Sequence, residues 1–284
     1  MCIRDSAYGV PETITQTGYI AHPRCSHDGR YMLYFYKESD EEYGLRLYDW
    51  EQQAIQETQW PEDTWFANFH PSEDRIVYNG DGKICTADVD GSNATCFGSP
   101  IPYESITGEP IWSPDGEWIA FTDFVGAPSH SHIFIAHSVA GEMTQLTSGP
   151  GDFRKPAWSP DGSRIAYLHS VDDGAELWVM DPTGEPFLGI TQTLLAPWDT
   201  PVWSPDGTML AVPGYYDEED ETSGGIWIVP LDGSSPWMVP GTEGMDCWYP
   251  TWYPDGSPLA YWSTLTGTVP SPITGTLGSG WPLF

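Results

Sequence analysis

Carboxylates are the chemically versatile side chains that this sequence supplies in excess. Its 284 residues contain 41 Asp and Glu against 10 Lys and Arg, which gives a formal net charge of −31. Acidic clusters interleaved with aromatic residues attract cations and stack on guanidinium groups or sugar rings. The clusters and neighbouring indoles of interest are Glu38, Asp40, Glu41, Glu42, Trp60, Trp65, Asp172, Asp173, Trp198, Asp217, Glu218, Glu219, Asp220 and Glu221. The sequence predicts that these residues form a binding face.

The same charge argues against several partners. A negative field of this size repels a phosphate backbone and an anionic lipid surface, so we expect no binding to nucleic acid. No stretch approaches 18 uninterrupted apolar residues, so we expect no membrane insertion. A protein partner or a basic peptide is the expected ligand of the acidic face, and weak binding of divalent cations stays open. The competing interpretation is a solvated acidic surface suited to salty surroundings. We expect the chain to be a monomer.

Motifs of common catalytic and metal sites do not occur in the sequence. There is no Gly-x-Ser-x-Gly segment and no Gly-rich phosphate loop that leads into a helix. Asp217–Glu221 lacks the alternating oxygen ligands and the glycine of a calcium loop. His130 and His132 place two imidazoles on one side of an extended segment, but no third ligand accompanies them. We therefore predict no catalytic residue, no cofactor and no metal site, and a chain that is not an enzyme.

Five cysteines include one pair with the spacing of a cross-strand disulfide. Cys85 and Cys96 lie symmetrically about Asp90-Gly91, so a hairpin turn there sets them directly opposite one another. Cys25 is expected to be a buried thiol. A disulfide is typical of proteins in oxidising, extracytoplasmic compartments.

An internal repeat predicts the elements that position these residues. The segment Pro110-Ile-Trp-Ser-Pro-Asp-Gly116 recurs at 156–162 and 201–207, and looser copies begin at Pro23, Ala67 and Pro250. The Asp position of the motif falls at residues 28, 72, 115, 161, 206 and 255, a period near 45. Pro-Asp-Gly favours a tight turn because Pro presets φ, Asp accepts backbone N–H groups and Gly tolerates positive φ. In each repeat a short strand that ends in Trp precedes this turn, and three further strands follow it.

Six four-stranded units at this period predict an all-β fold, a six-bladed β-propeller that forms a single domain over residues 1–284. The sixth unit lacks clear third and fourth strands, because residues 268–273 include two prolines. Glu12–Thr17 is similar to the outer strands expected at 143–148 and 187–192. We therefore expect this N-terminal strand to complete and close the last blade. Residues 264–284 are expected to be an irregular, truncated tail.

The repeat, read as Pro-x-Trp-Ser-Pro-Asp-Gly followed by Ile-Ala-Phe or Ile-Ala-Tyr, resembles that of TolB-type propellers. The same repeat occurs in the propeller domains of prolyl-oligopeptidase-like peptidases. The resemblance covers residues 12–263. It implies a non-catalytic scaffold for binding a protein or another ligand, in the periplasm or secreted, although this chain shows no signal peptide. The alternative that it implies is the propeller fragment of a serine peptidase that lacks its hydrolase domain.

Connections between the expected strands alternate between the two ends of each blade. The motif turns and the turns before the outer strands are short and uniform, whereas the other loops are longer and more varied. Binding residues in repeat proteins concentrate on the variable loops. We therefore expect the acidic binding face at the end opposite the motif turns.

Overall fold

A computed structural model describes residues 19–37, 43–61, 64, 66–80, 82–98, 108–125, 130–171, 174–189, 196–197, 199–215, 224–244, 246–252, 260–264 and 271–273. These residues form strands and turns. They include no helix of the length and apolarity needed to cross a membrane. The chain divides into two compact units: unit 1 comprises Met1–Ser129 and Phe134–Thr144, and unit 2 comprises His130–Ile133 and Gln145–Phe284.

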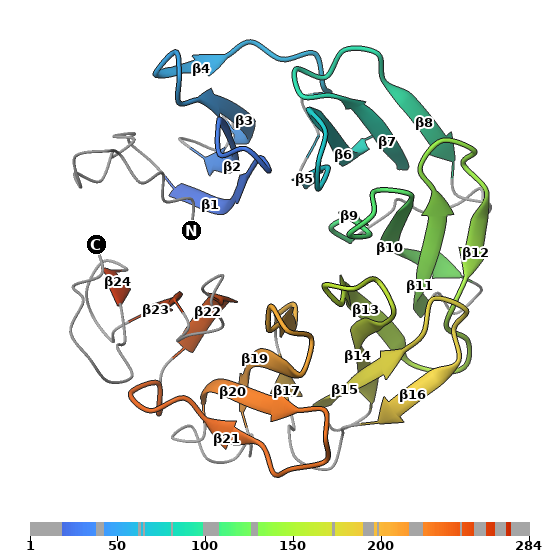
Figure 1. Cartoon of the computed structure of the whole chain (residues 1–284), viewed down its shortest axis with the longest axis vertical. Coiled ribbons are helices and arrows are strands. Elements are labelled where there is room, and N and C mark those ends of the chain that lie inside the picture. Colours follow the sequence, from blue (N-terminus) through green and yellow to red (C-terminus); the bar gives the residue numbers. More distant parts are fainter. Residues whose placement is uncertain are drawn as a thin grey trace. The chain divides into compact units, whose positions relative to one another are not determined.

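Unit 1 contains three four-stranded sheets in which strands neighbour one another in chain order (Figure 1). The first is β1 (Tyr19–Cys25), β2 (Tyr31–Lys37), β3 (Tyr43–Asp49) and β4 (Ala54–Gln56). The second is β5 (Ala67–Phe69), β6 (Arg75–Gly80), β7 (Lys83–Asp88) and β8 (Thr95–Gly98). The third is β9 (Ile111–Trp112), β10 (Trp118–Val125), β11 (His130–His137) and β12 (Met143–Gln145), with the first residues of β11 grouped in unit 2. Apolar residues of neighbouring sheets, such as Val77, Ile84 and Phe121, pack together as the core.

Unit 2 contains one four-stranded sheet, one five-stranded sheet and one three-stranded sheet. The first is β13 (Asp152–Trp158), β14 (Ile165–Val171), β15 (Gly174–Met180) and β16 (Pro186–Gly189). The second is β17 (Ala196–Pro197), β18 (Val202–Trp203), β19 (Met209–Tyr215), β20 (Gly225–Pro230) and β21 (Trp237–Met238). Its inner strand is split, because β17 and β18 both pair with β19. The third is β22 (Asp246–Thr251), β23 (Ala260–Thr264) and β24 (Ser271–Ile273).

The number of blades differs from the expectation. Five sheets reach four strands, whereas β22–β24 form a sheet of three among the described residues, so the prediction of six four-stranded blades is wrong. The predicted closing strand, Glu12–Thr17, lies outside the described residues. The third strand of the last sheet forms despite its proline: Pro272 pairs with Trp262 in β24, an edge strand of the described sheet. Edge positions accept proline because one side of the strand needs no ladder hydrogen bond.

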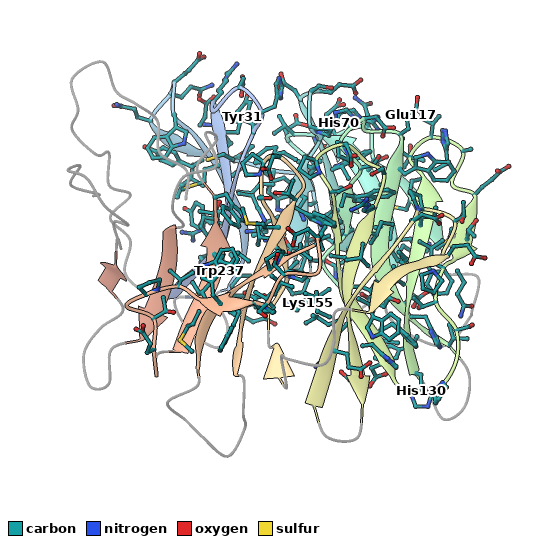
Figure 2. The ribbon with its side chains drawn as sticks, turned by 60° about the horizontal axis from the view of Figure 1, so that its bottom comes forward. Tyr31, His70, Glu117, His130, Lys155 and Trp237 are labelled. Atoms are coloured by element: carbon teal, nitrogen blue, oxygen red, sulfur yellow. A yellow bond between two sulfur atoms is a disulfide. The ribbon has the colours of Figure 1, made fainter. Side chains whose placement is uncertain are left out.

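Each well-formed motif turn is held by a serine and an aspartate. Ser159 Oγ donates to Asp161 Oδ1 at 2.6 Å and accepts the backbone amide of Arg164 at 2.9 Å. Asp161 Oδ1 also accepts the amide of Ser163 at 3.0 Å, and Gly162 takes a φ of 71°. The turns at 113–118 and 204–209 repeat this arrangement. Figure 2 shows Tyr31, His70 and Glu117, which lie in or beside the three motif turns of unit 1, at one end of that unit.

Three motif tryptophans donate a hydrogen bond to the preceding inner strand, whereas the buried Nε1 of a fourth, Trp158, has no hydrogen-bond partner among the described residues. Trp112 Nε1 donates to the Asn68 carbonyl at 3.3 Å, and Trp203 Nε1 donates to the Ala157 carbonyl at 2.9 Å. Trp252 Nε1 donates likewise to the carbonyl of Val202, at 3.1 Å. In each case the acceptor directly precedes the aromatic residue of the preceding motif. Each of these carbonyls also faces the amide of its partner in its own sheet, namely Val77, Ala166 or Ala211, so the indole adds a second hydrogen bond and links two successive sheets.

Candidate binding site

The three acidic segments of the predicted face lie outside the described residues: Glu38, Asp40, Glu41 and Glu42; Asp172 and Asp173; and Asp217, Glu218, Glu219, Asp220 and Glu221. Trp65 and Trp198 lie outside them as well. The strands that flank these segments are described. Their last paired residues are Lys37 with Tyr43, Val171 with Gly174, and Gly214 with Gly225. In each sheet this hairpin end is opposite the motif turn that precedes β2, β14 or β19.

Trp60 is the one member of the predicted face that the structure describes. It is 9% exposed and packs in a core cluster with Leu33, Leu47 and Tyr78. The turn at Gly91 lies directly against it, since a Cβ there would be 2.7 Å from the Trp60 amide nitrogen. Its side chain therefore contributes to packing rather than to an exposed aromatic surface.

Two described acids from the variable loops are engaged in ion pairs between repeats. Within unit 1, Glu109 Oε1 accepts Arg24 Nη2 at 2.7 Å and Asn68 Nδ2 at 3.1 Å, while Arg24 Nε donates to Asn68 Oδ1 at 3.1 Å. Within unit 2, Lys155 Nζ lies 3.3 Å from Asp199 Oδ1, and the Asp199 side chain is only 7% exposed. Both carboxylates lie beside inner strands and hold neighbouring repeats together.

Of the two histidines at 130 and 132, His132 belongs to a stack of rings in unit 2. The His132 ring stacks on Phe153 with centroids 5.2 Å apart, and Phe153 stacks on His169 at 4.2 Å. His132 Nδ1 lies 3.3 Å from Thr147 Oγ1, and burial lowers the pKa of its imidazole. His130 Nδ1 is 3.8 Å from an Asp152 carboxylate oxygen. Among the residues with a described position, no three His, Cys, Asp or Glu gather closely enough to hold a metal ion.

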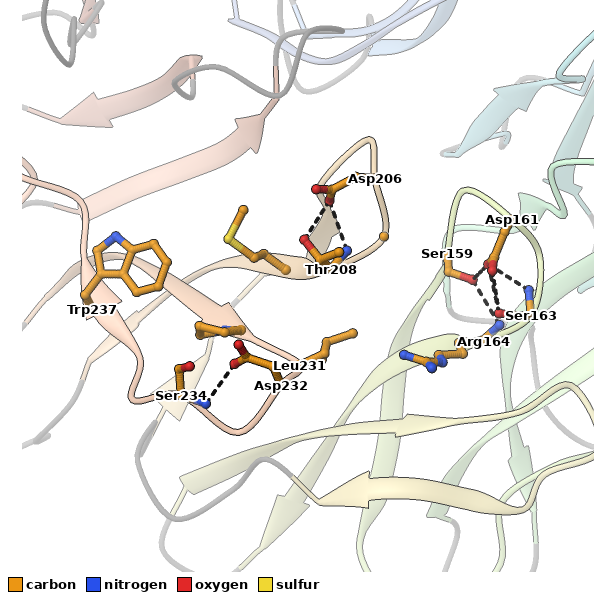
Figure 3. Close-up of a pocket in the computed structure, with 13 residues that line it drawn as sticks. Ser159, Asp161, Ser163, Arg164, Asp206, Thr208, Leu231, Asp232, Ser234 and Trp237 are labelled. Carbon is orange, nitrogen blue, oxygen red and sulfur yellow. Dashed lines mark hydrogen bonds between the residues drawn. The ribbon is translucent and has the colours of Figure 1, made fainter.

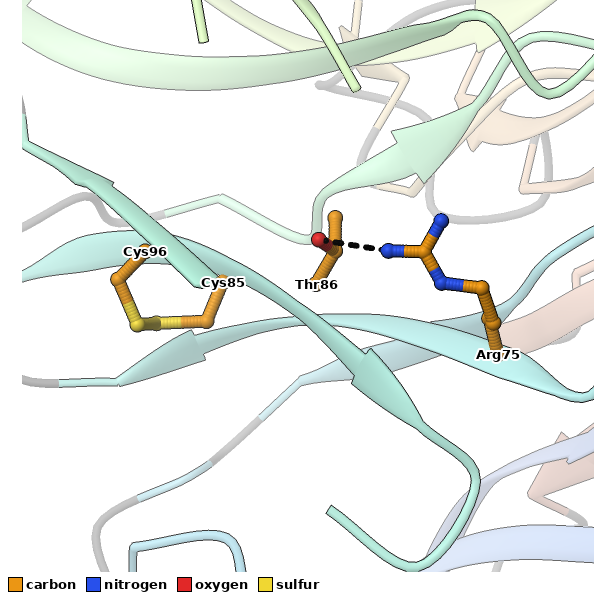
Figure 4. The surroundings of a disulfide bond; sticks show 4 residues. All are labelled: Arg75, Cys85, Thr86 and Cys96. Atoms are coloured by element: carbon orange, nitrogen blue, oxygen red, sulfur yellow. Dashed lines mark hydrogen bonds between the residues drawn. A yellow bond between two sulfur atoms is a disulfide. The ribbon is translucent and has the colours of Figure 1, made fainter. Parts of the chain in front are cut away.

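A disulfide joins Cys85 of β7 to Cys96 of β8, which are directly paired with Cα atoms 4.0 Å apart (Figure 4). This is the pairing that the spacing about Asp90-Gly91 predicts, although the connection from Asp88 to Thr95 is longer than a two-residue turn. The Cys85 side is buried and the Cys96 side is exposed. Cys25 is also disulfide-bonded, which corrects the expectation of a buried thiol.

Unit 2 contains a pocket of about 610 Å³ at the end of its sheets where the motif turns lie (Figure 3). Three turns surround it: the motif turns between β13 and β14 and between β18 and β19, and the turn between β20 and β21. The lining residues are Ser159, Asp161, Ser163, Arg164, Asp206, Gly207, Thr208, Met209, Pro230, Leu231, Asp232, Ser234 and Trp237. A volume in this range is usual for small-ligand and side-chain binding sites.

The carboxylates of this pocket are held in their ionised form. Hydrogen bonds from the Ser159 hydroxyl and from Ser163 lower the pKa of Asp161 to about 2. Donation from the Ser204 hydroxyl and from Thr208 lowers the pKa of Asp206 in the same way. The pKa of Asp232 is lowered by hydrogen bonds from Ser234. The pocket therefore keeps its negative charge across the pH range in which proteins normally fold.

A model of the TolB beta propeller domain family matches residues 72–213, which is half of the chain. The protein belongs to this TolB β-propeller family. The match includes the motif turns near residues 115, 161 and 206, so it covers both motif turns of the pocket. A search of curated protein sequences gives no match.

Solved structures show the same fold at low sequence identity. TolB from Acinetobacter baumannii aligns with a TM-score of 0.62 and 18% identity, over 80% of this chain and 56% of that chain. Oligogalacturonate lyase from Vibrio parahaemolyticus gives 0.67 and 14%, over 87% and 70% of the two chains. The β-propeller domain of the Trilobed protease from Pyrococcus furiosus gives 0.63 and 13%, over 92% and 86%. This TolB-type chain thus spans little more than half of the A. baumannii protein.

The sequence analysis missed the pocket because it gave the motif turns of this TolB-type propeller only a role in folding and none in binding. The available signal was the repetition itself. Neighbouring copies of the motif lie side by side, so their aspartates necessarily lie around a common surface. Trp237, which is 45% exposed on the outer strand β21, also lines the pocket, but it belongs to no repeated motif.

Proposed function

We propose that this protein is a non-catalytic propeller that binds a protein partner or a basic peptide through its acidic, aromatic-rich loops. One observation carries the proposal. In unit 2 the hairpins β14–β15 and β19–β20 both end opposite their motif turns, and their ends flank Asp172-Asp173 and Asp217–Glu221 respectively. Two acidic segments that leave one end of the same unit would create a negative field, and such a field raises the association rate of a cationic partner.

Binding of a biotinylated Lys- and Arg-rich peptide to the full chain tests this proposal. The loop variant replaces Asp217–Glu221 by Asn and Gln. The control variant neutralises five exposed acids of the turns at the other end of the sheets, namely Glu73, Asp74, Glu117, Glu142 and Glu185. We expect the loop variant to lower the association rate and to flatten its dependence on salt, since exposed charges are screened beyond about 10 Å at 0.1 M. Equal rates for the two variants would show that the loops hold no specific site.

The disulfides support an extracytoplasmic location, periplasmic or secreted, because such bonds persist in oxidising compartments. We also propose that Glu12–Thr17 pairs with the β22–β23–β24 sheet as a closing strand. The support for this closure is that this sheet has three described strands while the five others have at least four.

A second candidate is the propeller domain of a prolyl-oligopeptidase-like serine peptidase. It is favoured by the likeness to the propeller of the Trilobed protease, which covers 92% of this chain. Extending the reading frame beyond Phe284 discriminates the two functions. A downstream Gly-x-Ser-x-Gly followed by Asp and His would indicate the peptidase.

A further inference from the structure

The pocket of unit 2 lies at the end of the sheets opposite the acidic hairpins, so what it binds is independent of the function proposed above. Asp161 and Asp206 come from equivalent positions in two successive motif turns, and Asp232 comes from the turn before β21. Figure 3 shows these three side chains around one open space. Arg164 is the single cationic residue in the lining, so three carboxylates and one guanidinium leave the pocket with a net charge of −2.

An apolar surface accompanies this charge. Trp237 is 45% exposed, which is unusual for an indole in a protein whose other described tryptophans are largely covered. Met209 and Leu231 continue the apolar lining and are partly buried against the core. An aromatic face beside carboxylates is the environment in which a guanidinium or an ammonium with its aliphatic stem is stabilised.

The carboxylates are spread around the pocket and do not converge. Within the described part of the chain no three acidic or other metal-ligating side chains are close enough to share one ion. Each aspartate also commits Oδ1 to its own turn. Separated charges suit a ligand that carries more than one positive group along its length.

We propose that this pocket binds a basic segment of a partner protein, with an Arg or Lys side chain against Trp237 and its neighbours in reach of Asp161, Asp206 and Asp232. The occupant follows from charge complementarity between a net negative pocket and a cationic chain. A neutral glycan could also stack on Trp237, but it would leave the three carboxylates without a partner.

Titration calorimetry of the full chain with acetylated, amidated tri-arginine tests the proposal. Tri-citrulline, which keeps the shape and removes the charge, is the comparison ligand. We expect tri-arginine to bind at least tenfold more tightly, and we expect its affinity to fall as salt rises from 0.05 to 0.5 M. Equal binding of the two peptides, or no binding of tri-arginine at low salt, would overturn the proposal.

A pair of matched variants locates the binding. Asp232→Asn and Asp90→Asn change the same residue in two Asp-Gly-Ser turns, each with the serine amide 2.9 Å from the carboxylate, and only Asp232 lines the pocket. We expect D232N and W237A each to weaken tri-arginine binding about two- to fivefold, the size of one exposed charge or cation–π contact, and D90N to leave it unchanged. Equal affinities for D232N and D90N would refute the site. Loss of binding only in the Asp217–Glu221 variant would refute it too, while supporting the loop face.

Discussion

Replacing Trp203 by Phe tests whether the repeated tryptophan holds neighbouring inner strands together. Trp203 is 7% exposed and packs with Leu168, Leu177 and Val212, while its Nε1 donates to the Ala157 carbonyl at 2.9 Å. Phenylalanine keeps most of the apolar contact but removes the donor. The Ala157 carbonyl keeps its partner in the sheet, Ala166, so the substitution loses the net contribution of one hydrogen bond, about 0.5–1.5 kcal/mol. The smaller ring loses about 1 kcal/mol more, on the scale of one buried methylene group.

The expected destabilisation is therefore about 1.5–2.5 kcal/mol, which for a chain of this size lowers Tm by about 3–10 °C. Calorimetry and far-ultraviolet circular dichroism of the full chain measure this change. Trp237→Phe is the control, because its side chain is exposed and a surface substitution of this kind changes stability by about 0.5 kcal/mol or less. A Tm for Trp203→Phe within 2 °C of the control would refute the role given to the indole hydrogen bond.

Three further predictions follow from the described contacts. Replacing Cys85 and Cys96 by Ser removes a cross-link between residues 11 positions apart and should lower the free energy of unfolding by up to about 3 kcal/mol. Urea unfolding with and without reductant measures this change. Burial lowers the pKa of His132, so below about pH 6.5 this imidazole is protonated more readily in the unfolded chain than in the folded chain. Stability should therefore fall as pH drops from 7.5 to 5.5, and His132→Gln should reduce that fall in Tm. Deleting residues 1–17 should expose the edge of the last sheet and lower Tm markedly, whereas an unchanged Tm would exclude the proposed closure.

The strands were predictable because the residues of the motif favour a tight turn, and each turn marks where one strand ends and the next begins. Ser, Pro, Asp and Gly each have one role in the turn, so a period of about 45 residues was enough to place the sheets. The same kind of turn forms in an imperfect copy of the motif, at residues 67–73. His70 takes the serine position, and its Nδ1 accepts the amides of Ser72 and Glu73. Its ring fills the space beside Gly116, where a Cβ would collide with it.

Contacts between repeats were harder to predict, although part of the signal was present. Arg24 and Asn68 occupy the same motif position, directly before the aromatic or its replacement, so stacking of successive inner strands brings them together. Glu109 joins them from a different position, 85 residues from Arg24. Which neighbour supplies the charge depends on side-chain length and strand bulges, such as the register shift between Ala21 and Arg24. A one-dimensional repeat does not encode these shifts.

The acidity of the chain separates into groups with different physical explanations. A turn aspartate such as Asp161 has a pKa below its usual value, so it stabilises the fold above about pH 4 and loses this contribution as pH falls further. Glu109 and Asp199 are explained by their ion pairs. Folding therefore accounts for these charges, whereas the acids at 38–42, 172–173 and 217–221 belong to the loops for which we propose binding. In the pocket Asp161, Asp206 and Asp232 each hold a turn and also line the open space. For this reason the affinity of D232N must be compared with that of D90N. The D90N substitution alters an equivalent turn that does not line the pocket, so it measures the effect of the turn alone.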